Sequence, residues 1–336
     1  MAFGRHQFLV GLVAFGVTAL CVGRSLAQSS LPKVVRIGYQ VIPNAELLVK
    51  VKGLAKNAFG DGVEVQYVNF DSGRDVNTAI AAKSIDFGLV GSVPAAIGVA
   101  RGLEYDVFFL HDIIGQAEAL AVKSGISKPA DLVGKRIAVP FGSTTHFSLL
   151  AYLDLEGVDA SKVTILDLQP PDIVAAWQRG DIDGAYVWQP NLSRLLNDGG
   201  SVLTDSAVLA KRGALTADVG VVRREFAEQY PEALKRYVKA LDQAVELYRA
   251  NPEDAIASLS KELGLTPEET KEAASQLIWL TAKEQQAAAY LGQPGAQAGF
   301  AKVLEETAQF LVAQGIIPTA PSADTYQKHI RSQALQ

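Results

Sequence analysis

Apolar and polar positions in the first third of the chain follow a strand, helix, strand rhythm. Residues 63–70 (VEVQYVNF) alternate apolar and polar side chains, as a half-buried strand does. A turn is expected at residues 91–94, followed by a helix through residue 100. Strands are predicted at 34–39, 63–70 and 85–90, and helices at 46–59 and 75–82. This alternation predicts an α/β fold with largely parallel sheets.

The same rhythm restarts after residue 118 and ends in a long helical tail from residue 226. Two chain crossings, near residues 115–119 and 216–220, would join two lobes, form a hinge and leave a ligand cleft between them. The expected division is lobe 1 at 28–117, lobe 2 at 118–217, and a return to lobe 1 with the C-terminal helices at 218–336. Strands are predicted at 119–123, 136–140, 163–168, 182–188 and after Asp218, and helices at 144–156 and 173–180.

The first 27 residues have the order of a secretory signal peptide. Arg5 precedes an apolar run over residues 8–22, and Ser25-Leu26-Ala27 supplies small residues for cleavage before Gln28. Two alternatives are an uncleaved membrane anchor, for which the run is short, and a lipoprotein modified at Cys21, which follows a leucine where a small residue is expected. The sequence therefore predicts export of a chain that begins at Gln28.

Composition narrows the function classes. The chain has 336 residues, of which 49% are hydrophobic and 20% charged, an ordinary globular balance. Two of its 31 basic residues and its single cysteine lie in residues 1–27, so 29 basic residues remain against 36 acidic ones, a net charge of −7. An acidic chain without a basic block is a poor nucleic-acid binder. Phosphate-loop, dinucleotide and metal-ligand motifs are absent, so neither cofactor nor metal is expected, and any ATPase must be another subunit.

Hydroxyl residues stand where an anion would bind. Ser143, Thr144 and Thr145 lie between a predicted strand and the helical run FSLLAYL, and a helix N-terminus attracts tetrahedral anions. The alternative is a plain helix cap. Ser92 occupies an equivalent position in the first lobe, as an anion contact or as part of a structural turn. Gln40 follows the first strand, at the sheet edge where ligands of α/β proteins gather.

An acidic residue near the second crossing suits a cation. Asp218 lies in the apolar string ALTADVGVV, where a lone carboxylate is costly to bury without a positive partner. Either a ligand supplies that charge, or Arg212 or Arg223 does. Glu118 at the first crossing is a second candidate, with a hinge hydrogen bond as its alternative. Trp188 ends a predicted strand and either walls a pocket or packs in the core.

Four stretches carry a family resemblance: residues 69–73 (NFDSG), 118–122 (EALAV), 136–148 (RIAVPFGSTTHFS) and 167–190 (DLQPPDIVAAWQRGDIDGAYVWQP). Over residues 34–320 the chain resembles the taurine-binding proteins of bacterial sulfonate ABC importers. It resembles more loosely the wider group that binds alkanesulfonates, nitrate and pyrimidine precursors. The resemblance implies a monomeric two-lobe type II periplasmic binding protein that delivers taurine to a permease driven by a separate ATPase.

The resemblance also implies roles for the candidate residues. The hydroxyl segment 143–145 and Ser92 would hold the sulfonate, Asp218 the amine, and Trp188 would wall the pocket. His146 is a further donor or a packing residue. Gly220 stands where the resemblance implies a bulky residue, which predicts a wider pocket and looser selectivity among sulfonates. The remaining alternatives are another small ligand of the group, or an enzyme acting on pyrimidine or quinone precursors with the same fold.

Overall fold

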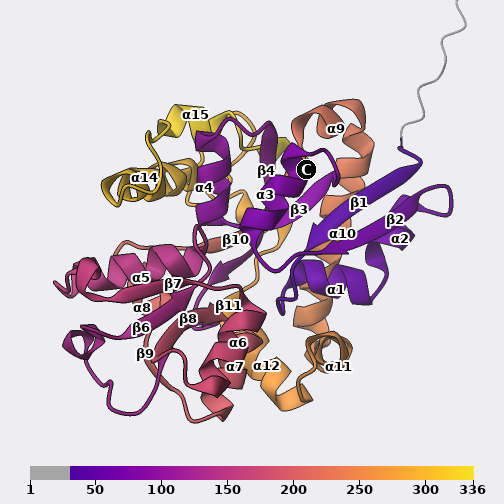
Figure 1. Ribbon diagram of the computed structural model, residues 1–336. Helices are drawn as coiled ribbons and strands as arrows, with labels where there is room; N and C mark the ends of the chain where they lie inside the picture. The colour runs from indigo at the N-terminus through magenta and orange to yellow at the C-terminus, as the bar shows by residue number, and fades with distance from the viewer. Residues whose placement is uncertain (1–30) are drawn as a thin grey trace, which may run out of the picture.

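The computed structural model describes residues 31–336 and divides their strands between two sheets (Figure 1). The predicted signal peptide and the cleavage before Gln28 lie outside the described residues. We call the part built on the six-stranded sheet the first lobe and the part built on the five-stranded sheet the second lobe. The first sheet has the order β11-β4-β10-β3-β1-β2, with β1 Val34–Tyr39, β2 Glu64–Asn69, β3 Phe87–Gly91, β4 Tyr105–Ile114, β10 Ala217–Arg223 and β11 Leu277–Ile278. The second has the order β7-β6-β8-β5-β9, with β5 Glu118–Val122, β6 Arg136–Val139, β7 Thr164–Asp167, β8 Gly184–Trp188 and β9 Ser201–Asp205.

Helices cover both sheets. Those of the first lobe that precede the first crossing are α1 Ala45–Val51, α2 Leu54–Phe59, α3 Gly73–Ala81 and α4 Ser92–Ala100. Those of the second lobe are α5 Thr144–Leu155, α6 Pro170–Arg179, α7 Asn191–Asn197 and α8 Ser206–Ala210, with short 3-10 turns at Pro129–Leu132 and Ala160–Lys162. The C-terminal part contributes α9 Arg224–Gln229, α10 Pro231–Ala250, α11 Pro252–Leu263, α12 Pro267–Ser275, α13 Ala282–Gln285, α14 Gly299–Ala313, α15 Ala323–Gln327 and the 3-10 turn Ser332–Leu335.

The two-lobe α/β architecture is confirmed, but the sheets are mixed rather than mainly parallel. Strands β1, β2 and β3 run parallel, whereas β10 returns from the second lobe and runs antiparallel between β3 and β4. In the second sheet β6 is parallel to β7 and β8, and β5 is antiparallel to β8 and β9. Fully buried strands carry the same apolar run in either direction, so their sequences do not reveal the direction of pairing.

The predicted helix 46–59 is two helices. Helix α1 ends at Val51, and α2 begins at Leu54 after Gly53, whose φ of 66° is left-handed. Glycine adopts that conformation without a steric penalty, so the chain turns there instead of continuing. The turn expected at residues 91–94 is in fact the start of α4, because Pro94 takes a position in the first helical turn, where its missing N–H costs nothing.

The larger core lies under the first sheet and the C-terminal helices. The ring of Phe87 contacts those of Tyr237 at 4.7 Å and Phe226 at 5.3 Å between centroids, which ties β3 to α10 and α9. Helix α10 packs against α1 and α2, and α14 packs against α4, so the tail stabilises the first lobe as Figure 1 shows. Trp177 is buried in the smaller core of the second lobe.

Polar contacts also join the lobes. The Arg74 guanidinium on α3 lies 2.8 Å from the Asp167 carboxylate at the end of β7. Gln189, just after β8, donates to Gln276 beside β11 at 3.2 Å. The side chains of Arg74 and Asp167 are both partly exposed, so their ion pair contributes only about 0.2–1 kcal/mol to the closure of the lobes.

No helix in residues 31–336 combines the length and the apolar character that crossing a bilayer requires.

Candidate functional site

A small cavity of about 20 Å³ lies between the lobes, where the carboxyl ends of several strands meet. That volume has room for roughly one water molecule, so the lobes must part to admit a larger ligand. The side chains and glycines around it come from both lobes. Its lining residues are Gln40, Ile42, Gly73, Gly91, Pro94, Glu118, Ser143, Thr144, Trp188 and Asp218.

Two helices begin at the cavity, one from each lobe. The N-caps of α4 and α5 are Gly91 and Ser143, and both residues line the cavity. The first N–H groups of a helix have no carbonyl partner within the helix, and its N-terminus carries partial positive charge. One side of the cavity is therefore suited to an anion with several acceptor oxygens.

The hydroxyls of the 143–145 segment are already engaged. Ser143 Oγ donates to the Pro140 carbonyl at 2.6 Å and accepts from the His146 N–H at 3.2 Å, as a helix cap does. Thr145 Oγ1 lies 2.8 Å from Ser143 Oγ, and Thr145 does not line the cavity. Thr144 lines it and donates to Glu118 Oε1 at 2.5 Å. Backbone N–H groups are thus the more available donors.

Asp218 faces the cavity without a basic partner. Its side chain is buried, and among residues 31–336 no group donates a hydrogen bond or forms an ion pair with its carboxyl. The arginines considered as partners pair elsewhere, Arg212 with Glu156 and Arg223 with Asp86. The structural alternative of an Asp218–arginine pair is therefore wrong, and a positive charge is missing from this side of the cavity.

Two further buried acids lie beside Asp218. Asp112 is its register partner across β4 and β10, so both side chains emerge on one face of the sheet. Asn44 Nδ2 donates to Asp112 Oδ2 at 3.1 Å, while Asp112 Oδ1 has no partner in the described chain. Glu118 accepts hydrogen bonds from Thr144 and from Ser206, the latter at 3.4 Å.

This acidic group has unusual proton affinity. Burial, reinforced by the Asp218 charge, raises the pKa of Glu118 to about 8. Burial raises the pKa of Asp218, and burial together with the Asp218 charge raises the pKa of Asp112 well above its usual range. Carboxyls deprived of water and placed near one another favour their neutral forms. A cation bound among them would reverse that preference.

Of the remaining predicted residues, Gln40 and Trp188 line the cavity, whereas Ser92 holds a neighbouring helix in place. Gln40 lines the cavity and donates from Nε2 to the Leu89 carbonyl at 3.1 Å, and Trp188 lines it at the end of β8. Ser92 does not line it, because its Oγ accepts from the Ala217 N–H at 3.3 Å and so joins α4 to β10.

Gly220 does not widen the cavity. A Cβ at this position would lie 2.7 Å from Phe108 Cζ and 3.0 Å from His111 Nε2, so the residue faces the core of the first lobe. Asp218 and Gly220 share one face of β10, but Gly220 lies further along the strand, opposite Leu89 and Phe109, and so lies away from the cavity. His146 is a packing residue: it is buried and stacks on Phe141 with ring centroids 4.5 Å apart.

Sequence reasoning missed Asp112 and the small residues that let the lobes meet. A Cβ on Gly91 would lie 2.6 Å from Thr144 Cγ2, so a glycine is needed where the two lobes touch. The strand that carries Asp112 was not assigned, and no local motif distinguishes it. Ile42, Gly73 and Pro94 complete the wall. In residues 31–336 no three His, Cys, Asp or Glu side chains converge as metal ligands would.

The two α/β lobes with a cavity between them have the same fold as solved periplasmic binding proteins. The alkanesulfonate-binding protein SsuA from Xanthomonas axonopodis pv. citri, solved with bound MOPS, superposes with a TM-score of 0.73 at 24% identity, covering 89% of this chain and 98% of that one. The desulfurization enzyme DszB shares the fold with a TM-score of 0.64 at 17% identity, and the match covers 90% of this chain and 98% of that one. At these identities the likeness establishes the fold alone.

Sequence comparison is more specific. The model of the NMT1-like family matches residues 29–261. The taurine-binding periplasmic protein of Escherichia coli K12 is 42% identical over 290 residues, which cover 84% of this chain and 88% of that protein. The chain belongs to the NMT1-like family.

Proposed function

We propose that this protein is the periplasmic substrate-binding component of an ABC importer and that its ligand is taurine. Support comes from the similarity to the taurine-binding protein and from the chemistry of the cavity. Taurine carries a sulfonate and an ammonium group two carbons apart. The sulfonate would accept from the N-termini of α4 and α5, and the ammonium would lie against Asp218 and Glu118.

One observation carries this assignment: the buried Asp218 carboxyl faces the cavity without any basic partner in the described chain. A buried carboxylate is expensive without a cation, and the ammonium of a zwitterion supplies one. Nitrate, sulfate and simple alkanesulfonates bring an anion only, and they would leave the acid uncompensated.

The lobes would close on the ligand and present it to a membrane permease. Residues 28–117 and 218–336 would form one lobe and 118–217 the other, a division that the membership of the two sheets supports. Gln40, Trp188, Thr144 and the 143–145 backbone would surround taurine. Ser92 would support α4 from behind, as Thr145 supports Ser143.

A thermal-shift panel tests the substrate class. A ligand that binds only the folded state raises Tm in proportion to its saturation. We expect taurine at millimolar concentration to raise Tm by several degrees, ethanesulfonate less, and nitrate, sulfate and thiamine-type pyrimidines not at all. A shift with nitrate or a pyrimidine, and none with taurine, would refute the assignment.

A turnover assay separates binding from catalysis, which matters because an enzyme shares the fold. The taurine-binding periplasmic protein of Escherichia coli, 42% identical to this chain over 290 residues, is named as a binding protein, and we propose the same role here. Incubation with taurine, followed by mass analysis of the recovered ligand, should return it unchanged. Turnover at a rate proportional to protein concentration would favour an enzyme.

Taurine capture should release protons. In the empty site, pKa values of about 8 for Glu118 and about 7 for Asp218 keep the first carboxyl mostly protonated and the second partly protonated at neutral pH, and the bound ammonium favours their anions. Affinity should therefore rise with pH towards about 8, and fall up to about tenfold per pH unit below neutrality for each proton released. Calorimetry in phosphate and in Tris measures this release, because the apparent enthalpies differ by the protons transferred to buffer. Identical enthalpies in both buffers would contradict it.

The same shifts have a consequence for stability. The pKa of Glu118 is higher in the folded protein than in the unfolded chain, so the folded state binds more protons between about pH 4 and 8. Glu118 therefore contributes its full share to the stability of the empty protein below the pKa that it has in the unfolded chain. That contribution is lost as the pH rises through the folded-state pKa of about 8. Bound taurine should offset that loss, so its Tm shift should grow with pH.

A further inference from the structure

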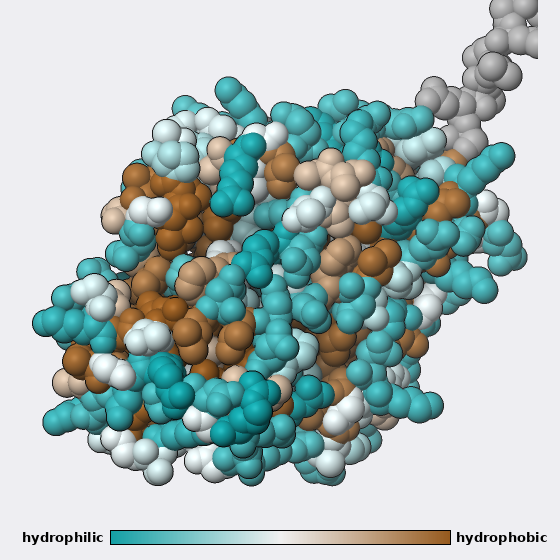
Figure 2. Space-filling view, in the orientation of Figure 1, coloured by the Kyte–Doolittle hydropathy of each residue, from teal (hydrophilic) through white to brown (hydrophobic). Residues whose placement is uncertain are grey.

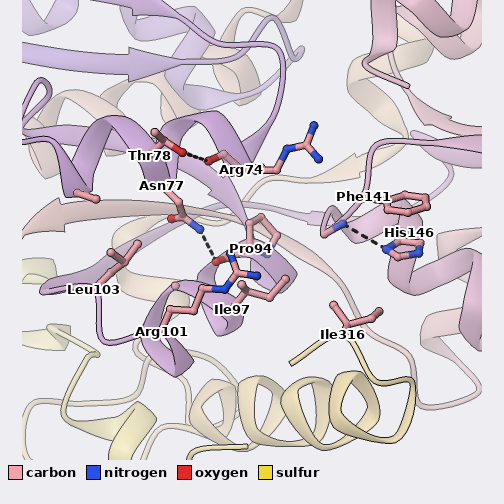
Figure 3. A pocket seen from close by; sticks show the side chains of 13 residues that line it. Arg74, Asn77, Thr78, Pro94, Ile97, Arg101, Leu103, Phe141, His146 and Ile316 are labelled. Atoms are coloured by element: carbon pink, nitrogen blue, oxygen red, sulfur yellow. Dashed lines mark hydrogen bonds between the residues drawn. The ribbon is translucent and has the colours of Figure 1, made fainter. Parts of the chain in front are cut away.

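A second, larger pocket opens between the lobes at a different place. It has a volume of about 560 Å³, within the usual size of small-molecule sites, and its only lining residue in common with the small cavity is Pro94. Helices α3 and α4 form one side, the loop and first turn of α5 another, and Ile316 after α14 the third (Figure 3). We call it the α3–α4 pocket.

Its walls are apolar and partly aromatic. Ile97, Leu103 and Ile316 project towards the space, and Phe141 and His146 stand together on the far side (Figure 3). The Phe141 and His146 rings are parallel within 4°. Burial lowers the pKa of His146 to about 4, so its ring is neutral at pH 7 and extends the aromatic surface. Apolar surface also borders the hollow between α4 and α5 in Figure 2.

The charge of the lining is positive although the whole chain is acidic. Arg74 and Arg101 line the pocket, and no aspartate or glutamate does. Arg74 is held by Asp167 at 2.8 Å, but Arg101 forms no ion pair or side-chain hydrogen bond within residues 31–336. Its side chain extends over Pro94 and Ile97 in Figure 3. Asn77 Oδ1 is buried without a partner, although its amide donates to the Pro94 carbonyl at 2.7 Å.

We propose that the α3–α4 pocket binds an organic anion with an aromatic or branched aliphatic body and a single sulfonate or carboxylate group. The Arg101 guanidinium would hold the acid group, since a planar guanidinium pairs with such oxyanions through two hydrogen bonds. The body would lie between Ile97, Ile316 and the Phe141–His146 pair. This site differs from the small cavity in both size and charge, because it offers no acid for an ammonium.

Occupancy should be linked to lobe closure. Phe141 and His146 belong to the second lobe, whereas Arg101 and Ile97 belong to the first, so a ligand between them contacts both. A ligand that binds the closed arrangement better stabilises it. The anion and a ligand of the small cavity should then strengthen each other by the same factor, because coupling between two sites is reciprocal.

Titration calorimetry with 2-naphthalenesulfonate tests the site, using purified protein with and without saturating taurine. We expect one site per chain in both conditions, tighter when taurine is present. Arg101→Gln should weaken binding about tenfold, through loss of a charged hydrogen-bond partner. Lys56→Gln, an exposed single-charge change on α2 away from the pocket, is the matched control and should leave it unchanged. Ile316→Asp, which adds a repelling charge to the wall, should weaken it at least as much as Arg101→Gln.

Three results would overturn the proposal. No binding at millimolar probe means that the pocket is not an anion site. Competitive displacement by taurine means that the probe occupies the small cavity. Equal affinity of Arg101→Gln and Lys56→Gln means that it binds elsewhere. Should taurine itself fail to bind, the function proposed above falls, while the comparison of the two charge variants still decides this site.

Discussion

Replacing Asp218 with asparagine should cost taurine binding about 3 kcal/mol or more, on the order of a hundredfold in Kd. The variant keeps the size of the side chain but removes the charge opposite the ammonium. Ethanesulfonate has the same sulfonate without the amine, so its affinity should change little or improve. Calorimetric titration of both ligands into wild type and variant measures the difference.

The control for folding comes from the empty protein. Asp218 is buried without a partner, so a neutral amide in its place should leave Tm unchanged or raise it. Glu118→Gln is a comparison variant. The Glu118 carboxyl already accepts hydrogen bonds from Thr144 and Ser206, so we expect this substitution to weaken taurine binding less than Asp218→Asn does. If taurine and ethanesulfonate lose affinity equally in Asp218→Asn, the residue does not bind the amine.

Gly91→Ala should prevent full closure and weaken taurine about tenfold or more, with little effect on the stability of either lobe. Its φ of −69° is ordinary for alanine, so the backbone is not strained. The new Cβ would instead lie 2.6 Å from Thr144 Cγ2 in the opposite lobe. Parting the lobes relieves that overlap, but it also separates the two helix N-termini that face the anion.

A second substitution isolates this steric cause. Thr144→Ser removes Cγ2 and keeps the hydroxyl that donates to Glu118. The next contacts of the Gly91 Cβ are Pro94 Cδ at 3.4 Å and Thr144 Oγ1 at 3.6 Å, both tolerable. The double variant Gly91→Ala/Thr144→Ser should therefore regain most of the affinity that Gly91→Ala loses, and small-angle scattering should show it to be as compact as wild type with taurine. If the losses of taurine affinity in the two single variants simply add in the double variant, residues 91 and 144 do not contact each other.

The periodic pattern predicted most elements because each follows from local chemistry. Strand β1 matches the expected residues 34–39, and α5 begins at Thr144 behind a serine cap, as the hydroxyl segment indicated. The single helix expected over 46–59 failed because one glycine was enough to turn the chain. Strand β4 was missed, and with it Asp112, because no polar alternation marks a strand buried on both faces.

The tertiary structure changed the roles of several candidate residues. Ser92 and Thr145 hold other groups in place and do not line the cavity, and Gly220 faces Phe108 and His111 in the core. None of these directions follows from sequence position, since each depends on which strand lies beside which. The partner of a buried charge is equally non-local: only the packed molecule showed that Arg223 serves Asp86 and leaves Asp218 alone.

By itself, the sequence determined the alternation of strands and helices, the two-lobe class of fold and the identity of the acid and hydroxyl segments, because these depend on nearest neighbours along the chain. Only the tertiary structure decided which of those segments meet, how closely the lobes approach at Gly91, and that the α3–α4 pocket exists. Such features arise from contacts between residues far apart in sequence, where direction, register and a few tenths of an ångström decide the outcome.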